Sequence, residues 1–163
     1  RGTGDIKAGG NYASSILSGE KAHTLGYSNV MYLDAVEHKY IEECGAANFI
    51  AIKDKCYITP KSPSILPSIT NDSLRQIAAD KGFIVEQRPI DVAELPTFEE
   101  CGACGTAAVI SPVGRIYDPL TKEYYEYGAE AGPVSVKLYT LLQDIQYGRV
   151  EDTHGWTKVI EGL

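Results

Sequence analysis

The segment Gly2-Thr3-Gly4-Asp5-Ile6-Lys7-Ala8-Gly9-Gly10-Asn11-Tyr12 holds one lysine, with two glycines before it and two after it. Glycine lets the backbone approach other groups closely and adopt dihedral angles that other residues avoid. A lysine among glycines can therefore be delivered into a crowded pocket instead of lying along a helix surface. Taken alone, the segment also fits a solvated, glycine-rich terminus, so the rest of the chain must decide its role.

Two further segments have features of an anion site. Leu66-Pro67-Ser68-Ile69-Thr70 runs into an expected helix, whose free N–H groups and positive dipole end attract phosphate. Thr70 either adds a hydroxyl to such a site or serves only as the helix N-cap. Gly102-Ala103-Cys104-Gly105-Thr106-Ala107-Ala108 offers small side chains and the Thr106 hydroxyl, although a tight turn without a ligand explains that segment equally well.

A candidate acid occurs in the segment Tyr40-Ile41-Glu42-Glu43-Cys44-Gly45-Ala46-Ala47-Asn48-Phe49. Glu43 lies between an apolar strand start and a run of small residues, where we expect partial burial. A buried carboxylate needs a cationic partner, or its pKa shifts and it becomes neutral. The alternative interpretation is a surface Glu-Glu pair at the end of a strand.

Hydrophobic spacing and turn residues predict helices interspersed with short strands. Helices are expected over residues 12–25, from Thr70 to before Gly82, and from Pro133 to before Gly148. Strands are expected over residues 29–34, 47–52, 56–59, 83–85, 106–110, 115–117 and 124–127, with a hairpin turn at 53–55 and a loop over 60–67. This mixture favours an α+β or mixed α/β fold.

Composition narrows the classes of partner. A chain of 163 residues suits one domain or part of a larger enzyme. A net charge of −7 disfavours nucleic acid as a ligand, because affinity for nucleic acid comes largely from lysine and arginine. No apolar run approaches the roughly 20 residues that span a bilayer, so we expect a cytoplasmic protein without a membrane partner. The four cysteines are expected to be reduced, and the acidic residues Glu94, Glu99 and Glu100 to lie in a solvated loop.

Together these segments resemble the fold-type-IV pyridoxal-phosphate enzymes, and among them the branched-chain amino-acid aminotransferases. The lysine segment of that family reads Gly-x-Gly-Asp-x-Lys-x-Gly-Gly-Asn-Tyr, and residues 2–12 fit every fixed position. The resemblance continues through Glu-x-Gly-x-x-Asn at 43–48, Leu-Pro-x-Ile-Thr at 66–70, Gly-Thr-Ala at 105–107 and Asp-Ile-Gln-Tyr-Gly at 144–148. It covers essentially the whole chain and implies a two-sheet pseudo-barrel of strands flanked by helices.

The resemblance implies a role for each matching residue. Lys7 resembles the lysine that forms a Schiff base with pyridoxal 5'-phosphate and later moves the proton between the substrate α-carbon and the cofactor. Tyr12 is similar to the tyrosine that hydrogen-bonds the phenolic oxygen of the cofactor. Glu43 resembles the carboxylate that faces the pyridine nitrogen and keeps it protonated. Leu66 is expected to pack against the ring.

The phosphate and substrate contacts follow in the same way. Ile69 and Thr70 resemble one side of the phosphate cup, and Thr106 resembles the other. Thr106 and Ala107 are expected at the substrate, with the Ala107 amide meeting the substrate carboxylate. The implied reaction is transamination of leucine, isoleucine and valine with 2-oxoglutarate.

Three departures from the family pattern qualify these expectations. Ser68 and Asn71 stand where the family often has glycine and arginine. Some relatives carry a redox-sensing Cys-x-x-Cys after the Gly-Thr-Ala turn, where this chain has Ala108 and Ser111. The complete enzymes also have an N-terminal small domain that closes over the cofactor. We therefore expect residues 1–163 to be the single cofactor-binding large domain of a longer enzyme, homodimeric at full length, and weakly active or inactive alone.

Other classes remain open from the sequence. A D-amino-acid aminotransferase or an aminodeoxychorismate lyase shares the same lysine and glutamate chemistry. A thiol or metal protein would have to be built on Cys101-x-x-Cys104 with Cys44 and Cys56. One Cys-x-x-Cys without a second pair or a nearby histidine is a poor zinc signature, so no metal ligand is expected.

Overall fold

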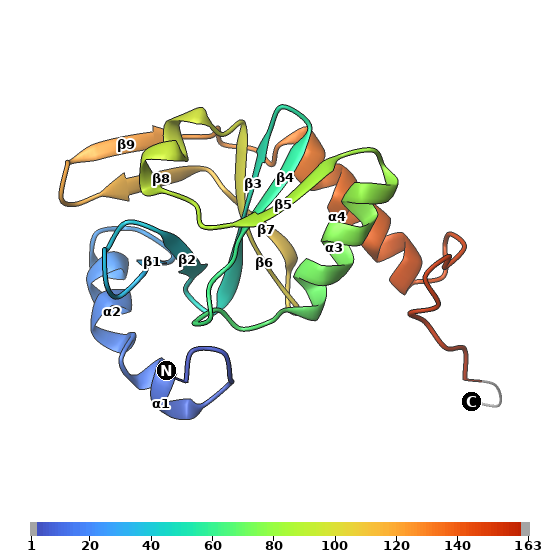
Figure 1. Ribbon diagram of the computed structural model, residues 1–163, viewed down its shortest axis with the longest axis horizontal. Helices are drawn as coiled ribbons and strands as arrows, with labels where there is room; N and C mark the ends of the chain where they lie inside the picture. The colour runs from blue at the N-terminus through green and yellow to red at the C-terminus, as the bar shows by residue number, and fades with distance from the viewer. Residues whose placement is uncertain (1–2, 161–163) are drawn as a thin grey trace.

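The computed structural model describes residues 3–160 and contains a seven-stranded sheet, a two-stranded sheet and helices packed around them (Figure 1). Two long helices cover one face of the larger sheet, and the small sheet and a short 3-10 helix help to cover the other face. The expected mixed α/β class is therefore confirmed. Among residues 3–160, no helix is both long and apolar enough to cross a membrane.

The larger sheet branches at strand β3 (Ala47–Lys53). Along one edge, β3 pairs first with β2 through Asn48 and then with β4 through Ala51, while β6 pairs with the opposite edge. All three pairings are antiparallel, and β4 pairs with β5 in parallel. The remaining strands of this sheet are β1 (Met31–Leu33), β2 (Ile41–Cys44), β4 (Cys56–Pro60), β5 (Ile84–Arg88), β6 (Glu100–Gly105) and β7 (Val109–Val113). Strands β8 (Arg115–Asp118) and β9 (Glu123–Glu126) form the small sheet.

Two tight turns fix the strands on either side of β3. The β2–β3 turn has Gly45 with a φ of 59°, and a Cβ there would overlap the side-chain oxygen of Asn29. The predicted β3–β4 hairpin is confirmed, and its turn residues Asp54 and Lys55 have φ values of 49° and 60°. Two consecutive positive φ values are the signature of a type I′ turn, whose twist matches that of the strands.

Helices α3 (Ile69–Asp80) and α4 (Pro133–Gln146) pack against the sheet as their apolar spacing predicts. In α3, Leu74, Ile77 and Ala78 are buried, as expected from the sequence. They join Leu138 and other residues of α4 in one core cluster with Ile50 and Tyr57 of the sheet. This packing places the N-terminus of α3 at a fixed position beside the sheet.

Glu100 is buried, which corrects the expectation that it lies in a solvated loop. It begins β6, and its carboxylate accepts hydrogen bonds from the backbone N–H groups of Val134 and Ser135 and from the Ser135 hydroxyl. A negative group at the start of a helix accepts hydrogen bonds from the free N–H groups and is attracted to the positive end of the helix dipole. Glu100 therefore attaches the start of α4 to the sheet, and a partner 34 residues away could not be recognised from spacing.

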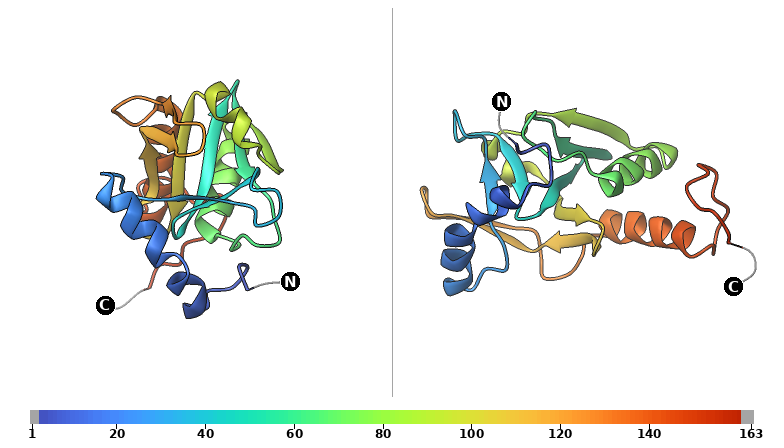
Figure 2. Two further views of the ribbon diagram at one scale, coloured as in Figure 1. Left: turned by 90° about the vertical axis from the view of Figure 1, so that its left-hand side faces the viewer. Right: turned by 90° about the horizontal axis from the view of Figure 1, so that it is seen from below.

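The N-terminal helix is present but broken. It consists of α1 (Gly9–Ala13) and α2 (Ile16–Thr24), because the hydroxyls of Ser14 and Ser15 hydrogen-bond to preceding backbone carbonyls. Neither helix buries a residue. Figure 2 shows α1 and α2 near one end of the molecule and α4 with the residues after it toward the other.

The sequence-based strand prediction was wrong around residue 106. Strand β6 ends at Gly105, residues 106–108 form a turn, and β7 begins at Val109 and includes Pro112. Strands β2 and β6 and the 3-10 helix η1 (Val92–Thr97) were missed. β6 is rich in small residues because Ile50 packs over it, so that a Cβ at Gly102 would lie 3.2 Å from an Ile50 carbon. Small residues give no hydrophobic alternation, which explains the miss.

Candidate active site

The lysine segment folds as a compact loop over residues 3–8 that leads into α1. The Asn11 side chain donates to the carbonyls of Thr3 and Ile6, with nitrogen–oxygen distances of 2.6 and 2.9 Å. A Cβ on Gly4 would overlap the carbonyl oxygen of Ser64, so this position requires glycine. The close approach sets the lysine segment against the loop that precedes α3. Gly2, the first residue of the motif, lies outside the described residues.

Lys7 lies in this loop, and Tyr12 lies in the first turn of α1 close to it. The Lys7 Nζ atom donates to the Tyr12 hydroxyl oxygen at 3.4 Å, and both side chains are exposed. Exposure leaves the amine accessible to a reacting aldehyde, and the hydroxyl one hydrogen bond away can contact the same ligand. The pair satisfies the geometric requirement that a nucleophile and its polar neighbour be within hydrogen-bond reach.

Glu43 is partly buried on β2, under the loop that leads to α3. Its Oε1 atom accepts the backbone N–H of Leu66 at 3.2 Å and the side-chain amide of Asn48 at 3.3 Å. Burial raises the pKa of the Glu43 carboxyl above its usual value, while the Leu66 N–H and the positive charge of Lys7 act in the opposite direction. One loop connects the two parts of the predicted site, because its Ser64 carbonyl lies against Gly4 and its Leu66 N–H donates to Glu43. The alternative of a surface Glu-Glu pair is not supported.

Asn48 is a residue of the site to which no role was predicted. It pairs with Glu43 across the β2–β3 turn, and its side chain also donates to the carbonyl of Leu66 at 3.2 Å. One signal was present in the sequence, because Asn48 ends the quoted Glu-x-Gly-x-x-Asn pattern. The cross-strand pairing that provides its partner is visible only in the structure.

The start of α3 has free donors where a phosphate was expected. Ser68 is the N-cap, and its hydroxyl accepts the N–H of Asn71 at 3.2 Å. The alternative that Thr70 is merely the cap is therefore wrong. Ile69 and Thr70 are the first two helical residues, and such positions have no partner within the helix for their N–H groups. These two donors and the Thr70 hydroxyl can hold an anion.

Thr106 and Ala107 lie in the exposed turn between β6 and β7. Val109, the first residue of β7 after this turn, has a φ of 59° and is buried in the core. A β-branched residue rarely adopts positive φ, so the surrounding core must hold the turn in this strained shape. Strain of this kind is common where a backbone segment is shaped for a ligand. Within residues 3–160, the Thr106 hydroxyl makes no hydrogen bond to the other candidate residues.

Sheet register brings these parts to one end of the fold. Glu43 pairs with Asn48, which pairs on its other side with Cys104, one residue before Gly105 and the Thr106 turn. The backbone of Leu66 is attached to the same end of the sheet by its hydrogen bonds to Glu43 and Asn48. The acid, the ring-packing candidate and the predicted phosphate contacts thus lie around one end of β2, β3 and β6, below which α1 lies in Figure 1.

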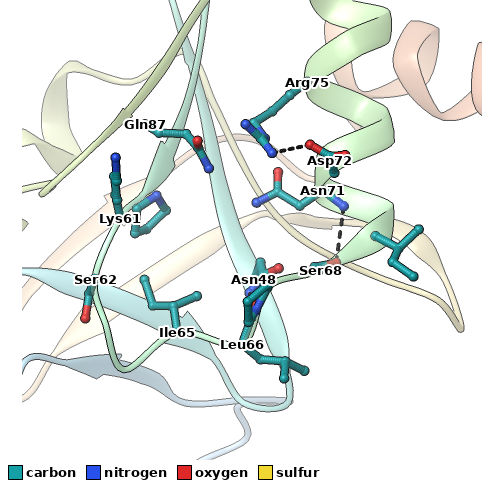
Figure 3. Close-up of a pocket in the computed structure, with 13 residues that line it drawn as sticks. Asn48, Lys61, Ser62, Ile65, Leu66, Ser68, Asn71, Asp72, Arg75 and Gln87 are labelled. Atoms are coloured by element: carbon teal, nitrogen blue, oxygen red, sulfur yellow. Dashed lines mark hydrogen bonds and ion pairs between the residues drawn. The ribbon is translucent and has the colours of Figure 1, made fainter. Parts of the chain in front are cut away.

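A pocket of about 380 Å³ is lined by the loop that carries Leu66 and by the start of α3 (Figure 3). It extends from Asn48 and Leu66 to residues of α3 and β5, including Asn71, Arg75 and Gln87. Lys7, Glu43 and Thr106 do not line it. The pocket therefore borders the candidate site and shares Leu66 and Ile69 with it, but the candidate lysine and acid lie outside it.

The cysteines offer no thiol or metal centre. Cys101 and Cys104 lie in core clusters on opposite faces of the sheet, because they are three residues apart on β6. Burial raises the pKa of each thiol to about 12, so both are protonated near neutral pH. Among residues 3–160, no three histidine, cysteine, aspartate or glutamate residues are grouped so that they could hold a metal ion. The thiol or metal alternative has no site in the described part of the chain.

Residues 4–116 match the protein family described as amino-transferase class IV. The chain belongs to the class IV aminotransferases. The branched-chain-amino-acid aminotransferase of Haemophilus influenzae is 46% identical over 98% of this chain and 49% of its own length. This class IV aminotransferase chain thus spans about half the length of the curated relatives it matches.

Solved structures agree with this assignment. The branched-chain amino acid aminotransferase of Escherichia coli is 33% identical, with a TM-score of 0.81 over 94% of this chain and 50% of its own. The branched-chain amino acid aminotransferase from Thermobaculum terrenum, solved in its PLP form, is 32% identical, with a TM-score of 0.78 over 90% of this chain and 46% of its own. The fold type predicted from the sequence is therefore confirmed.

Proposed function

We propose that this chain is the cofactor-binding domain of a pyridoxal-phosphate-dependent branched-chain amino-acid aminotransferase. One observation carries the proposal. Lys7, hydrogen-bonded to Tyr12, and the partly buried Glu43 are joined by one loop, which contacts Gly4 of the lysine segment at Ser64 and donates to Glu43 from the Leu66 N–H. An amine, an acid and a helix N-terminus at one end of the fold are what the three ends of this cofactor require.

The residues present fit pyridoxal 5'-phosphate. Its ring, when bound, withdraws electrons from the substrate α-carbon. Lys7 Nζ would bond covalently to the aldehyde carbon and afterwards hold the proton taken from the substrate α-carbon. The Tyr12 hydroxyl would donate to the phenolic oxygen. Glu43 would accept a hydrogen bond from the ring nitrogen, and Leu66 would pack against the ring.

The phosphate would be held between two donor groups. The N–H groups of Ile69 and Thr70, with the Thr70 hydroxyl, form one side, and the Thr106 hydroxyl forms the other. Thr106 would also border the substrate, and the Ala107 N–H would meet the substrate carboxylate. The names of the similar proteins support branched-chain amino acids as substrates. We propose their L forms, with 2-oxoglutarate as the acceptor of the amino group.

The proposal extends to the longer enzyme of which this chain would be part. A preceding small domain would close over the cofactor, so the 163-residue chain would turn over weakly or not at all by itself. At full length we propose a cytoplasmic homodimer. Amino transfer by the isolated chain at the rate of the full-length enzyme would contradict this part of the proposal.

Covalent labelling tests the central assignment. The chain is incubated with pyridoxal 5'-phosphate and reduced with borohydride, and the modified peptide is mapped by mass spectrometry. We expect the label on Lys7, unchanged labelling in the Lys21→Arg control on the exposed face of α2, and none in Lys7→Arg. A label on another lysine of the full-length protein, or none, would refute the proposal.

Substrate assays separate the related activities. The full-length enzyme is expected to transfer the amino group of leucine, isoleucine and valine to 2-oxoglutarate. Activity on D-alanine would instead identify a D-amino-acid aminotransferase, and activity on aminodeoxychorismate would identify a lyase. Either result would leave the role of Lys7 intact and replace the substrate class.

A further inference from the structure

The two oxygens of the Glu43 carboxylate have different surroundings. Oε1 accepts two hydrogen bonds, from the Leu66 N–H and from the Asn48 amide. Oε2 accepts no hydrogen bond from any residue within 3–160. Two donors on one oxygen fix the plane of a carboxylate that would otherwise rotate about its last bond. Oε2 is thereby left available to a ligand.

The Asn48 side chain uses both of its N–H groups at this point. One donates to Glu43 Oε1 at 3.3 Å and the other to the Leu66 carbonyl at 3.2 Å. Its orientation is determined by its partners, because a reversed amide would turn its oxygen toward two acceptors. Asn48 is 4% exposed, and its own oxygen is buried without a partner. An unpaired buried oxygen destabilises the fold. The benefit of an asparagine at this position must therefore come from the two hydrogen bonds that its amide group donates.

We propose that Asn48 is a positioning residue, which orients the Glu43 carboxylate by tying Oε1 to the Leu66 loop and leaves Oε2 free to face the cofactor ring. The inference rests on the proposed function, because it gives Glu43 a ring nitrogen to meet. Asn48 touches neither cofactor nor substrate and acts through Glu43. It also joins the acid to the segment that carries the phosphate contacts, so that the two ends of the cofactor are held at a fixed separation.

A change in the charge state of Glu43 follows from removing Asn48. The titratable groups around Glu43 are Glu42 and Cys44 on its own strand, Tyr32 opposite on β1, and Lys7 from the N-terminal segment. An amide donor stabilises the ionised carboxylate, so Asn48→Ala must raise the Glu43 pKa further. We expect a rise on the order of one pH unit.

Carbon-13 NMR of the cofactor-free chain measures this directly. Glutamate is labelled at the side-chain carboxyl carbon, and the Glu43 resonance is identified by its loss in Glu43→Gln. The titration midpoint should rise in Asn48→Ala and, to a smaller extent, in Asn48→Ser. Asn71→Ala is the matched control, because Asn71 is also buried but donates to Thr59 and accepts from Tyr57. Equal midpoints in Asn48→Ala and Asn71→Ala would overturn the proposal.

A measurement on the unmodified chain covers the case in which the variants do not fold. The side-chain amide resonances of Asn48 should shift with the same midpoint as the Glu43 carboxyl. Amide resonances that do not change through that midpoint would overturn the proposal. In the full-length enzyme, the acid limb of the kcat/KM profile should move upward with the Glu43 midpoint in Asn48→Ala.

The labelling experiment distinguishes the two possible failures. If Lys7 carries the cofactor label after reduction and the Glu43 titration midpoint is the same with and without Asn48, the positioning role fails and the proposed function stands. If the midpoint responds and Lys7 is not labelled, Asn48 controls the carboxylate, but the proposed function, and with it the orientation toward a cofactor ring, fails.

Discussion

The carboxylate of Glu43 and the backbone N–H of Leu66 lie 3.2 Å apart and share a hydrogen bond. Twenty-three residues separate them in the chain. The bond attaches the loop before α3 to the edge of the sheet, so the acid and the helix N-terminus cannot move independently.

Glu43→Gln should stabilise the cofactor-free chain near neutral pH. Burial raises the pKa of Glu43, so the folded state binds its proton more tightly than the unfolded state. Stability is then lost as the pH rises from the ordinary glutamate pKa, about 4.3, through the raised value, and glutamine removes that loss. Thermal unfolding should show a higher midpoint for Glu43→Gln at pH 7 and little difference below about pH 4. A variant that is less stable at pH 7 would contradict the desolvation argument.

Thr70→Val should weaken cofactor binding without unfolding the protein. The valine keeps the shape and loses one hydroxyl donor to a charged phosphate, which corresponds to a loss of about 10-fold or more in affinity. Equilibrium dialysis of pyridoxal 5'-phosphate with the full-length enzyme measures the change. Ser73→Ala on the same helix is the control, since its hydroxyl donates only to the Ile69 carbonyl. Equal affinities in the wild type and Thr70→Val would remove Thr70 from the site.

Glu100→Ala should destabilise the chain strongly. The alanine leaves the N–H groups of Val134 and Ser135 and the Ser135 hydroxyl without their acceptor. Loss of a buried charged acceptor at a helix start costs about 2 kcal/mol or more. Urea unfolding measures the difference. The neighbouring Glu99→Ala removes one exposed bond to the Asp54 N–H and should cost less than about 1 kcal/mol.

Lys55→Gly should stabilise the β3–β4 hairpin. Lys55 has a φ of 60°, a conformation that costs an L-residue about 1 kcal/mol relative to glycine. The urea midpoint should therefore rise. Lys53→Gly, at the end of β3, has no such strain to relieve and should lower it. A fall in both variants would show that the Lys55 side chain stabilises the fold by more than its backbone strain destabilises it.

None of the four cysteines should react with an aromatic disulfide reagent in the native chain. All four thiols are buried, and burial raises the pKa of Cys101 and Cys104 to about 12. Reaction requires an exposed thiolate, so it should follow global unfolding. Absorbance on addition of the reagent, with and without urea, measures this. Rapid reaction of one thiol without urea would indicate a local opening near β3 or β6.

The sequence by itself indicated the candidate site residues and determined the local elements. Lys7, Glu43 and Thr70 were predicted as cofactor contacts because their segments resemble motifs of one enzyme family. Helix α3 and the β3–β4 hairpin were predicted because hydrophobic periodicity and turn residues act over a few neighbouring positions. The N-terminal helix was predicted as one piece, since spacing does not reveal that two serine hydroxyls interrupt it.

Only the tertiary structure decided which distant residues meet. Strand β6 exists because its small residues pair with β3 and accommodate Ile50, and no periodicity records that partnership. The Asn48 amide has two acceptors because β2 and the Leu66 loop bring them to it. A hydrogen bond depends on positions in space to within a few tenths of an ångström, and only the assembled sheet fixes such positions between residues far apart in the chain.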